Sequence, residues 1–139
     1  MLTEEQKQNI ELENRAIAEN IQNIRYRILV FSGKGGVGKT TVSVNLAYGL
    51  QKRGNNAGLI DADVTGPNVP KMLGLKGGLR TKGKKILPLI RDGLKVISIA
   101  NALPLNQPVV WRGPMRSKLL RQFLADVEWG SLDYLVADL

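Results

Sequence analysis

The sequence contains no cysteine and no histidine. Without cysteine, the chain forms no disulfide, and its own side chains hold neither an iron–sulfur cluster nor a thiolate zinc site. Without histidine, it has no imidazole base and no imidazole metal ligand. Any chemistry therefore depends on carboxylates, lysines, hydroxyls, backbone amides and a bound cofactor.

Long hydrophobic runs are also missing, and the longest apolar stretch is far shorter than a membrane span. The amino end has neither the basic start nor the apolar run of a signal peptide. We therefore expect a soluble, cytoplasmic protein. The length of 139 residues, with 43% hydrophobic and 23% charged residues, predicts one folded domain or part of one and excludes disordered and collagen-like classes.

Charge is unevenly distributed in a chain whose formal net charge is +8. Residues 1–24 carry two basic and five acidic side chains, whereas residues 71–95 carry eight basic and one acidic. A basic stretch of this kind can attract phosphate polymers or anionic lipid. It lacks the interleaved aromatic residues and the motifs of nucleic-acid binding, so a solvated surface is the favoured interpretation, and neither nucleic acid nor membrane is an expected partner.

Apolar spacing predicts alternating helices and strands. Ile10, Ile17 and Ile21 indicate an amphipathic helix through about residue 22, which either packs on the domain, the favoured reading, or serves as a partner-binding arm. Further helices are expected at 40–54 and 115–129, and strands at 25–32, 56–63, 84–90, 94–100 and 131–139. The helix at 40–54 has Val42, Leu46, Gly49 and Leu50 on one face and Gly54 as its C′ residue. The strands at 84–90 and 94–100 are expected to be joined by a turn at Asp92-Gly93.

The motif that carries chemistry is Gly-Lys-Gly-Gly-Val-Gly-Lys-Thr at residues 33–40, which matches G-x-x-x-x-G-K-[ST] between a strand and a helix. Its backbone amides are expected to surround phosphate oxygens, while Lys39 reaches the β- and γ-phosphates and Thr40 coordinates Mg²⁺. Thr41 is expected at the α-phosphate. The expected nucleotide-binding residues are Gly33, Lys34, Gly35, Gly36, Val37, Gly38, Lys39, Thr40 and Thr41. The alternative is a flexible glycine turn.

Three acidic residues follow or end predicted strands: Asp61, Asp63 and Asp138. Ligands of open α/β sheets bind beside the carboxyl ends of the strands. Carboxylates at that edge suit Mg²⁺ coordination through water and the orientation of an attacking water. An acidic residue at the end of a strand can instead have a purely structural role, in which it caps the next turn. For Asp61 and Asp63 both the functional and the structural interpretation stay open. Asp138 ends an apolar strand, as a Walker B aspartate does, and is expected at the metal.

The run Lys-Gly-Gly-Val-Gly-Lys-Thr-Thr resembles the deviant Walker A loop of the MinD, ParA and nitrogenase iron protein superfamily. Three stretches, at residues 28–41, 59–75 and 109–139, resemble one branch of it, the Mrp/ApbC family of iron–sulfur carrier ATPases. The resemblance implies that Lys34 reaches the partner's nucleotide across a dimer, that Asp63 orients the water and that Asp61 belongs to the metal shell. It makes Lys34, Lys39 and Asp63 the expected catalytic residues.

The implied fold is an α/β, doubly wound, mostly parallel sheet of the P-loop NTPase type, incomplete at the carboxyl end. Residues 1–23 are expected as an amino-terminal helix and residues 24–139 as the first part of an ATPase domain. The implied whole protein is a homodimeric Mg²⁺-dependent ATPase that binds ATP and delivers iron–sulfur clusters to apo-proteins.

One departure from the family is the absence of its C-x-x-C pair, so a cluster can bind only through cysteines that this sequence does not contain. We expect the sequence to be the first part of a longer protein. The alternatives are a MinD/ParA-like positioning ATPase that binds membrane or DNA, and a non-catalytic remnant whose phosphate loop serves only structure.

Overall fold

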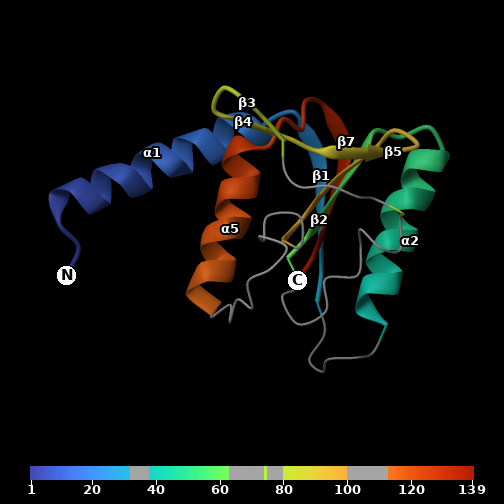
Figure 1. Ribbon diagram of the computed structural model, residues 1–139, viewed down its shortest axis with the longest axis horizontal. Helices are drawn as coiled ribbons and strands as arrows, with labels where there is room; N and C mark the ends of the chain where they lie inside the picture. The colour runs from blue at the N-terminus through green and yellow to red at the C-terminus, as the bar shows by residue number, and fades with distance from the viewer. Residues whose placement is uncertain (32–37, 63–73, 75–79, 100–112) are drawn as a thin grey trace.

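A five-stranded sheet lies between helices in the computed structural model, which describes residues 1–31, 38–62, 74, 80–99 and 113–139 (Figure 1). Its described helices are α1 (Glu4–Ile21), α2 (Lys39–Lys52) and α5 (Gly113–Asp126). The sheet contains β1 (Ile24–Val30), β2 (Ala57–Asp61), β5 (Leu89–Arg91), β6 (Leu94–Ser98) and β7 (Leu132–Asp138). Strands β3 (Arg80–Lys82) and β4 (Lys85–Leu87) form a separate antiparallel pair.

The strand order in the sheet is β1-β7-β2-β6-β5. The first four strands are parallel, and only β5 runs antiparallel, against β6. Helix α2 covers one face, and α5 covers the other with the end of α1 beside it (Figure 1). All five residues of β2 are buried, as expected for a strand covered on both faces. The expected mostly parallel α/β fold is therefore confirmed.

Helix α1 begins with a capping box, in which the Thr3 hydroxyl accepts from the Gln6 amide at 3.1 Å and the Gln6 side chain accepts from the Thr3 amide at 2.9 Å. Only the second half of α1 lies against α5, where Asn20 donates to the carbonyls of Leu124 and Val127. The first half extends away from the sheet (Figure 1), and Leu12 is 62% exposed. The expectation that this helix packs on the domain is thus confirmed for its second half only.

Helix α2 ends as its sequence predicts. Gly54 has φ +94°, its amide donates to the Gln51 carbonyl, and the Asn55 amide donates to the Leu50 carbonyl, which completes a Schellman motif. The predicted buried face is partly wrong, because Val42 is 58% exposed. The buried residues are Ser43, Val44 and Ala47.

The turn at Asp92-Gly93 joins β5 and β6 as predicted, with φ of +50° and +87° at its two central residues. The expected single strand at 84–90 is instead two strands, β4 and β5, which separate at Pro88 and belong to different sheets. Proline has no amide proton to donate to a ladder, so the pairing is interrupted there. The turn between β3 and β4 contains Gly83, whose φ is +63°.

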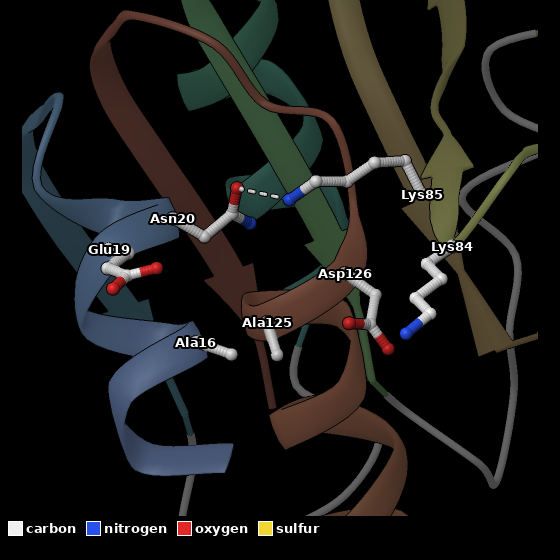
Figure 2. Close-up of a pocket in the computed structure, with 7 residues that line it drawn as sticks. All are labelled: Ala16, Glu19, Asn20, Lys84, Lys85, Ala125 and Asp126. Carbon is white, nitrogen blue, oxygen red and sulfur yellow. Dashed lines mark hydrogen bonds between the residues drawn. The ribbon is translucent and has the colours of Figure 1, made fainter. Parts of the chain in front are cut away.

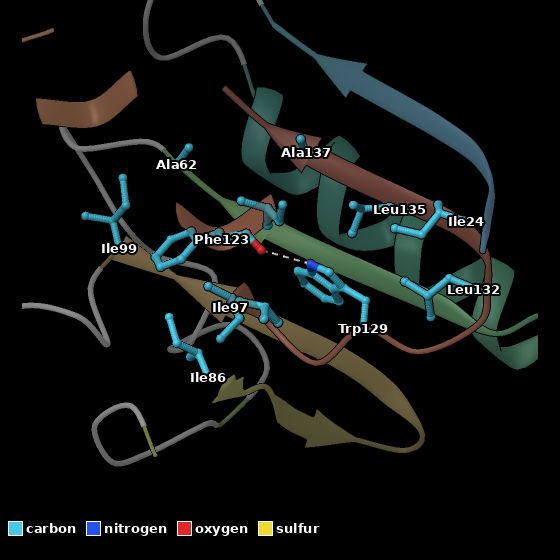
Figure 3. Packing of buried hydrophobic residues seen from close by; sticks show 12 residues of the cluster. Ile24, Ala62, Ile86, Ile97, Ile99, Phe123, Trp129, Leu132, Leu135 and Ala137 are labelled. Atoms are coloured by element: carbon cyan, nitrogen blue, oxygen red, sulfur yellow. Dashed lines mark hydrogen bonds between the residues drawn. The ribbon is translucent and has the colours of Figure 1, made fainter. Parts of the chain in front are cut away.

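The larger apolar cluster lies between the sheet and α5 (Figure 3). Its centre is Trp129, fully buried, whose indole N–H donates to the Phe123 carbonyl at 3.1 Å. On α5, Phe123 is buried in this cluster, and Leu119, Leu120 and Leu124 pack against it. The second cluster joins α2 to the other face of the sheet.

Gly58 of β2 faces the Trp129 ring, and a Cβ at this position would lie 2.9 Å from Trp129 Cζ3 and 2.9 Å from Leu132 Cδ1. Both neighbours are buried, so the Gly58→Ala variant should unfold more easily than the parent, by about 1–3 kcal/mol. Urea unfolding measures this loss. The matched control is Gly49→Ala on α2, where a Cβ meets no atom within 4 Å; it should gain about 0.5–1 kcal/mol. Equal effects of the two variants would contradict the close packing at Gly58.

The Tyr48 hydroxyl of α2 donates to the Asp92 carboxylate in the β5–β6 turn. That hydrogen bond, with the nearby negative charge, raises the pKa of Tyr48, because the phenol must stay protonated to donate. The interaction therefore stabilises the fold below about pH 10 and is lost as the pH rises through the pKa of the folded phenol. The Asp92→Asn variant should lower the pKa of Tyr48, which ultraviolet absorbance of the phenolates reports. Superimposable titration curves for the two proteins would exclude the contact.

Candidate functional site

The site lies where β1, β7 and β2 end. Asp138 is the last residue of β7, and in the register of the sheet it stands between Val30 of β1 and Asp61 of β2. Backbone hydrogen bonds hold this edge together, since the Leu139 amide donates to the Val30 carbonyl and the Ala62 amide to the Asp138 carbonyl, both at 2.9 Å. The carboxyl groups of Asp61 and Asp138 are both fully buried.

Helix α2 begins beside these carboxylates. Gly38, its N-cap residue, has φ +81°, a left-handed conformation that glycine adopts without strain. Lys39 and Thr40 form the first turn, so the helix directs its positive end and these two side chains toward the sheet edge. The described elements on either side of the motif, β1 and α2, agree with the strand and the helix predicted there.

Three groups of α2 contact the Asp138 carboxylate. The Lys39 ammonium forms an ion pair with Asp138 Oδ1, and the Thr40 hydroxyl donates to Oδ2 at 2.9 Å. Ser43 Oγ lies 3.0 Å from Oδ1. The Lys39 side chain is 12% exposed and the Asp138 side chain is fully buried, so the charge of the carboxylate is balanced within the protein.

The second carboxylate has its own partner. Ser98, the last residue of β6, pairs in register with Asp61, and its hydroxyl donates to Asp61 Oδ2 at 2.8 Å. Sequence reasoning identified neither Ser43 nor Ser98. Ser43 could have been found by its spacing of four residues from Lys39, which puts both on one helix face. Ser98 required the strand register.

Four of the expected site residues, Lys39, Thr40, Asp61 and Asp138, meet at this edge. Gly38 is the N-cap residue of α2, and Thr41 is exposed on the first turn of that helix. The other expected residues, Gly33, Lys34, Gly35, Gly36, Val37 and Asp63, lie outside the described residues. Within the described part of the chain, no three acidic side chains come together as a metal cluster. One carboxylate with a hydroxyl is instead the kind of set that holds Mg²⁺ together with waters and phosphate oxygens.

The basic stretch has mixed surroundings. Lys95 donates to the Trp129 carbonyl at 2.7 Å, and Lys85 donates to Asn20 at 3.4 Å. Lys84 and Lys85 line a surface cavity of about 320 Å³ with Glu19 and Asp126, and Figure 2 shows the Lys84 and Asp126 side chains directed toward one another. Acidic side chains thus accompany Lys84 and Lys85 at this cavity. No described helix is long and apolar enough to cross a membrane.

Comparison with known proteins gives the family. The NUBPL iron-transfer P-loop NTPase family matches residues 23–139. The chain belongs to this family. That membership confirms the resemblance to iron–sulfur carrier P-loop ATPases that the motifs indicated.

Two relatives are named iron–sulfur cluster carrier proteins. The one from Methanocaldococcus jannaschii is 50% identical over 125 residues, which cover 88% of this chain and 43% of the relative. The one from Bacillus subtilis is 51% identical over 120 residues, which cover 86% of this chain and 34% of the relative. The chain therefore spans less than half the length of these relatives.

A solved structure is also similar, that of the nucleotide-binding protein from Archaeoglobus fulgidus in complex with ADP. It is 40% identical in sequence with a TM-score of 0.78, and the match covers 91% of this chain and 49% of that one. The fold of that nucleotide-binding protein is thus shared over nearly all of the present chain.

The buried ion pair gives a test of the site geometry. The Lys39→Met variant leaves the Asp138 carboxylate buried without the ammonium and should lose about 3–5 kcal/mol of unfolding free energy. Adding Asp138→Asn removes the unbalanced charge and should recover most of that loss. Urea unfolding of the single and double variants measures both effects. The control Lys84→Met, at an exposed lysine, should stay within about 0.5 kcal/mol of the parent. A double variant no more stable than Lys39→Met would refute the pairing.

Proposed function

We propose that this chain is the nucleotide-binding part of a Mg²⁺-dependent ATPase that carries iron–sulfur clusters. The observation that supports the proposal best is the meeting of Lys39 and Thr40, at the start of α2, with Asp138 at the end of β7. A phosphate-loop lysine and hydroxyl opposite a strand-end aspartate form the arrangement that binds a nucleoside triphosphate with its metal.

Each residue has a task in this proposal. The amides from Gly33 to Gly38 and the positive end of α2 bind the phosphate oxygens. The Lys39 ammonium neutralises the β- and γ-phosphates, and the Thr41 hydroxyl binds the α-phosphate. Lys39 is the first residue of α2, and in the proposal its flexible side chain moves the ammonium from the Asp138 carboxylate to a phosphate bound at that end of the helix.

The described residues fit Mg²⁺. Thr40 and Asp138 provide hard oxygen atoms 2.9 Å apart, and Asp61 adds a second carboxylate one strand away. When bound, Mg²⁺ would neutralise charge on the β- and γ-phosphates. In the proposal, Thr40 contacts the metal directly, while Asp138 and Asp61 orient its water ligands.

For hydrolysis we propose Asp63 as the residue that orients the attacking water and Lys34 as a lysine that reaches the partner's nucleotide in a homodimer. The family resemblance of the loop supports these roles. Under the same proposal residues 24–139 form the first part of the ATPase domain, and the protein works in the cytoplasm.

The proposed cargo is an iron–sulfur cluster for apo-protein clients, supported by the names of the relatives. Because this sequence has no cysteine, the cluster would be held by cysteines outside it. A MinD/ParA-like positioning role is less well supported, since the relatives from Methanocaldococcus jannaschii and Bacillus subtilis are named iron–sulfur cluster carrier proteins. Salt-sensitive pelleting with anionic liposomes or DNA would favour that alternative.

The proposal is tested by nucleotide binding. A fluorescent ADP analogue should bind this chain in the presence of Mg²⁺, and the Lys39→Ala variant should bind it about 10- to 100-fold more weakly, because a charged partner of the phosphates is lost. Circular dichroism establishes that the variant is folded. The exposed control Lys84→Ala should bind like the parent. Retained affinity in a folded Lys39→Ala protein would contradict the proposed phosphate site.

A further inference from the structure

Ser43 is a buried hydroxyl that the proposed function does not use. It is fully buried on α2, one helical turn beyond Lys39. Its Oγ lies 3.0 Å from Asp138 Oδ1 and 3.1 Å from the Lys39 carbonyl oxygen. One hydroxyl proton serves two acceptors here, and the charged carboxylate is the stronger of them. The hydroxyl therefore donates mainly to Asp138.

The three α2 groups on Asp138 divide between its two oxygens. Ser43 and Lys39 contact Oδ1, whereas Thr40 contacts Oδ2. In the proposed function Lys39 turns to the phosphates and Thr40 binds Mg²⁺, so both change partners when nucleotide and metal bind. Ser43 has no such second task. It lies deeper in the helix and can keep Oδ1 in place throughout.

We propose that Ser43 is a positioning residue for Asp138: it fixes Oδ1, so that Oδ2 points to Thr40 and to the proposed magnesium position. This inference rests on the proposed function. A carboxylate held at one oxygen loses the freedom to rotate about its Cβ–Cγ bond, and a metal-binding oxygen placed in advance needs no ordering when the ion arrives. Ser43 thus acts on Mg²⁺ affinity through Asp138, without touching the nucleotide.

The competing explanation is purely structural. Serine hydroxyls inside helices often donate to the carbonyl four residues earlier, as the distance from Ser43 to the Lys39 carbonyl allows. In that case the hydroxyl affects only helix stability. The two explanations differ in what the Ser43→Ala variant does to Mg²⁺ dependence.

The experiment measures the affinity of this chain for a fluorescent ADP analogue, first with a chelator and then across a Mg²⁺ titration. For Ser43→Ala we expect an unchanged affinity without Mg²⁺ and a Mg²⁺ requirement raised about 10-fold, since one hydrogen bond to a charged group is lost. The Ser43→Thr variant keeps the hydroxyl and should restore the parental Mg²⁺ requirement. The control Asn45→Ala, at an exposed position two residues further along the same helix, should match the parent.

Each outcome is informative. Parental Mg²⁺ dependence in Ser43→Ala, or an equal loss of affinity with and without Mg²⁺, would overturn the positioning role and leave the proposed function intact. If the parent protein binds no ADP analogue at any Mg²⁺ concentration, the proposed function fails and this inference fails with it. A Ser43→Ala protein that unfolds at lower urea yet keeps the parental Mg²⁺ requirement would establish the structural explanation.

Discussion

The burial of a carboxylate at the end of β7 is the constraint on which this structure depends. A buried charge of this kind is tolerated only when donors surround it, and the donors of Asp138 come from the first turns of α2. The requirement fixes how far α2 is rotated about its axis. It draws Ser43 toward the sheet and leaves Val42 in solvent, although valine is the more apolar of the two.

The same constraint relates the fold to the site. The parallel register of β1, β7 and β2 brings Val30, Asp138 and Asp61 to one edge, and α2 starts at that edge because the strand before it ends there. The opposite face is held by a different means, the packing of α5 and Trp129 on the sheet. The polar site therefore lies at the carboxyl ends of strands whose other face packs against this apolar core.

Nucleotide binding and cluster binding need different kinds of ligand. The sheet edge at the end of β7 has the lysine, hydroxyl and carboxylate groups that nucleotide binding needs. Cluster binding instead needs soft ligands such as cysteine thiolates, which this chain lacks. Under the proposed function, the nucleotide-binding groups thus lie in this chain, whereas the cluster ligands lie outside it. Under the same proposal, communication between the two sites requires an element that responds to the nucleotide. Helix α2 is suited to that role because its first turn contacts Asp138 of the sheet and is the proposed binding site of the phosphates.

Much of this could be predicted from the sequence. The glycine motif placed the start of α2, Gly54 placed its end, the Asp92-Gly93 pair placed a hairpin, and alternation of strands with helices gave the parallel sheet. These signals are local, since glycine conformations and apolar spacing act within a few residues of chain. Aspartates at strand ends were recognised as site candidates on the same basis, and the structure brings Asp61 and Asp138 together.

The sequence by itself determined the kind and order of the helices and of the parallel strands, together with the family motifs. Only the tertiary structure decided which donors face Asp138, that Ser98 faces Asp61, and that the stretch at 84–90 divides between two sheets at Pro88. The physical reason is that these features depend on helix rotation and strand register. Both are set by contacts between residues far apart in the chain, which no local pattern of side chains encodes.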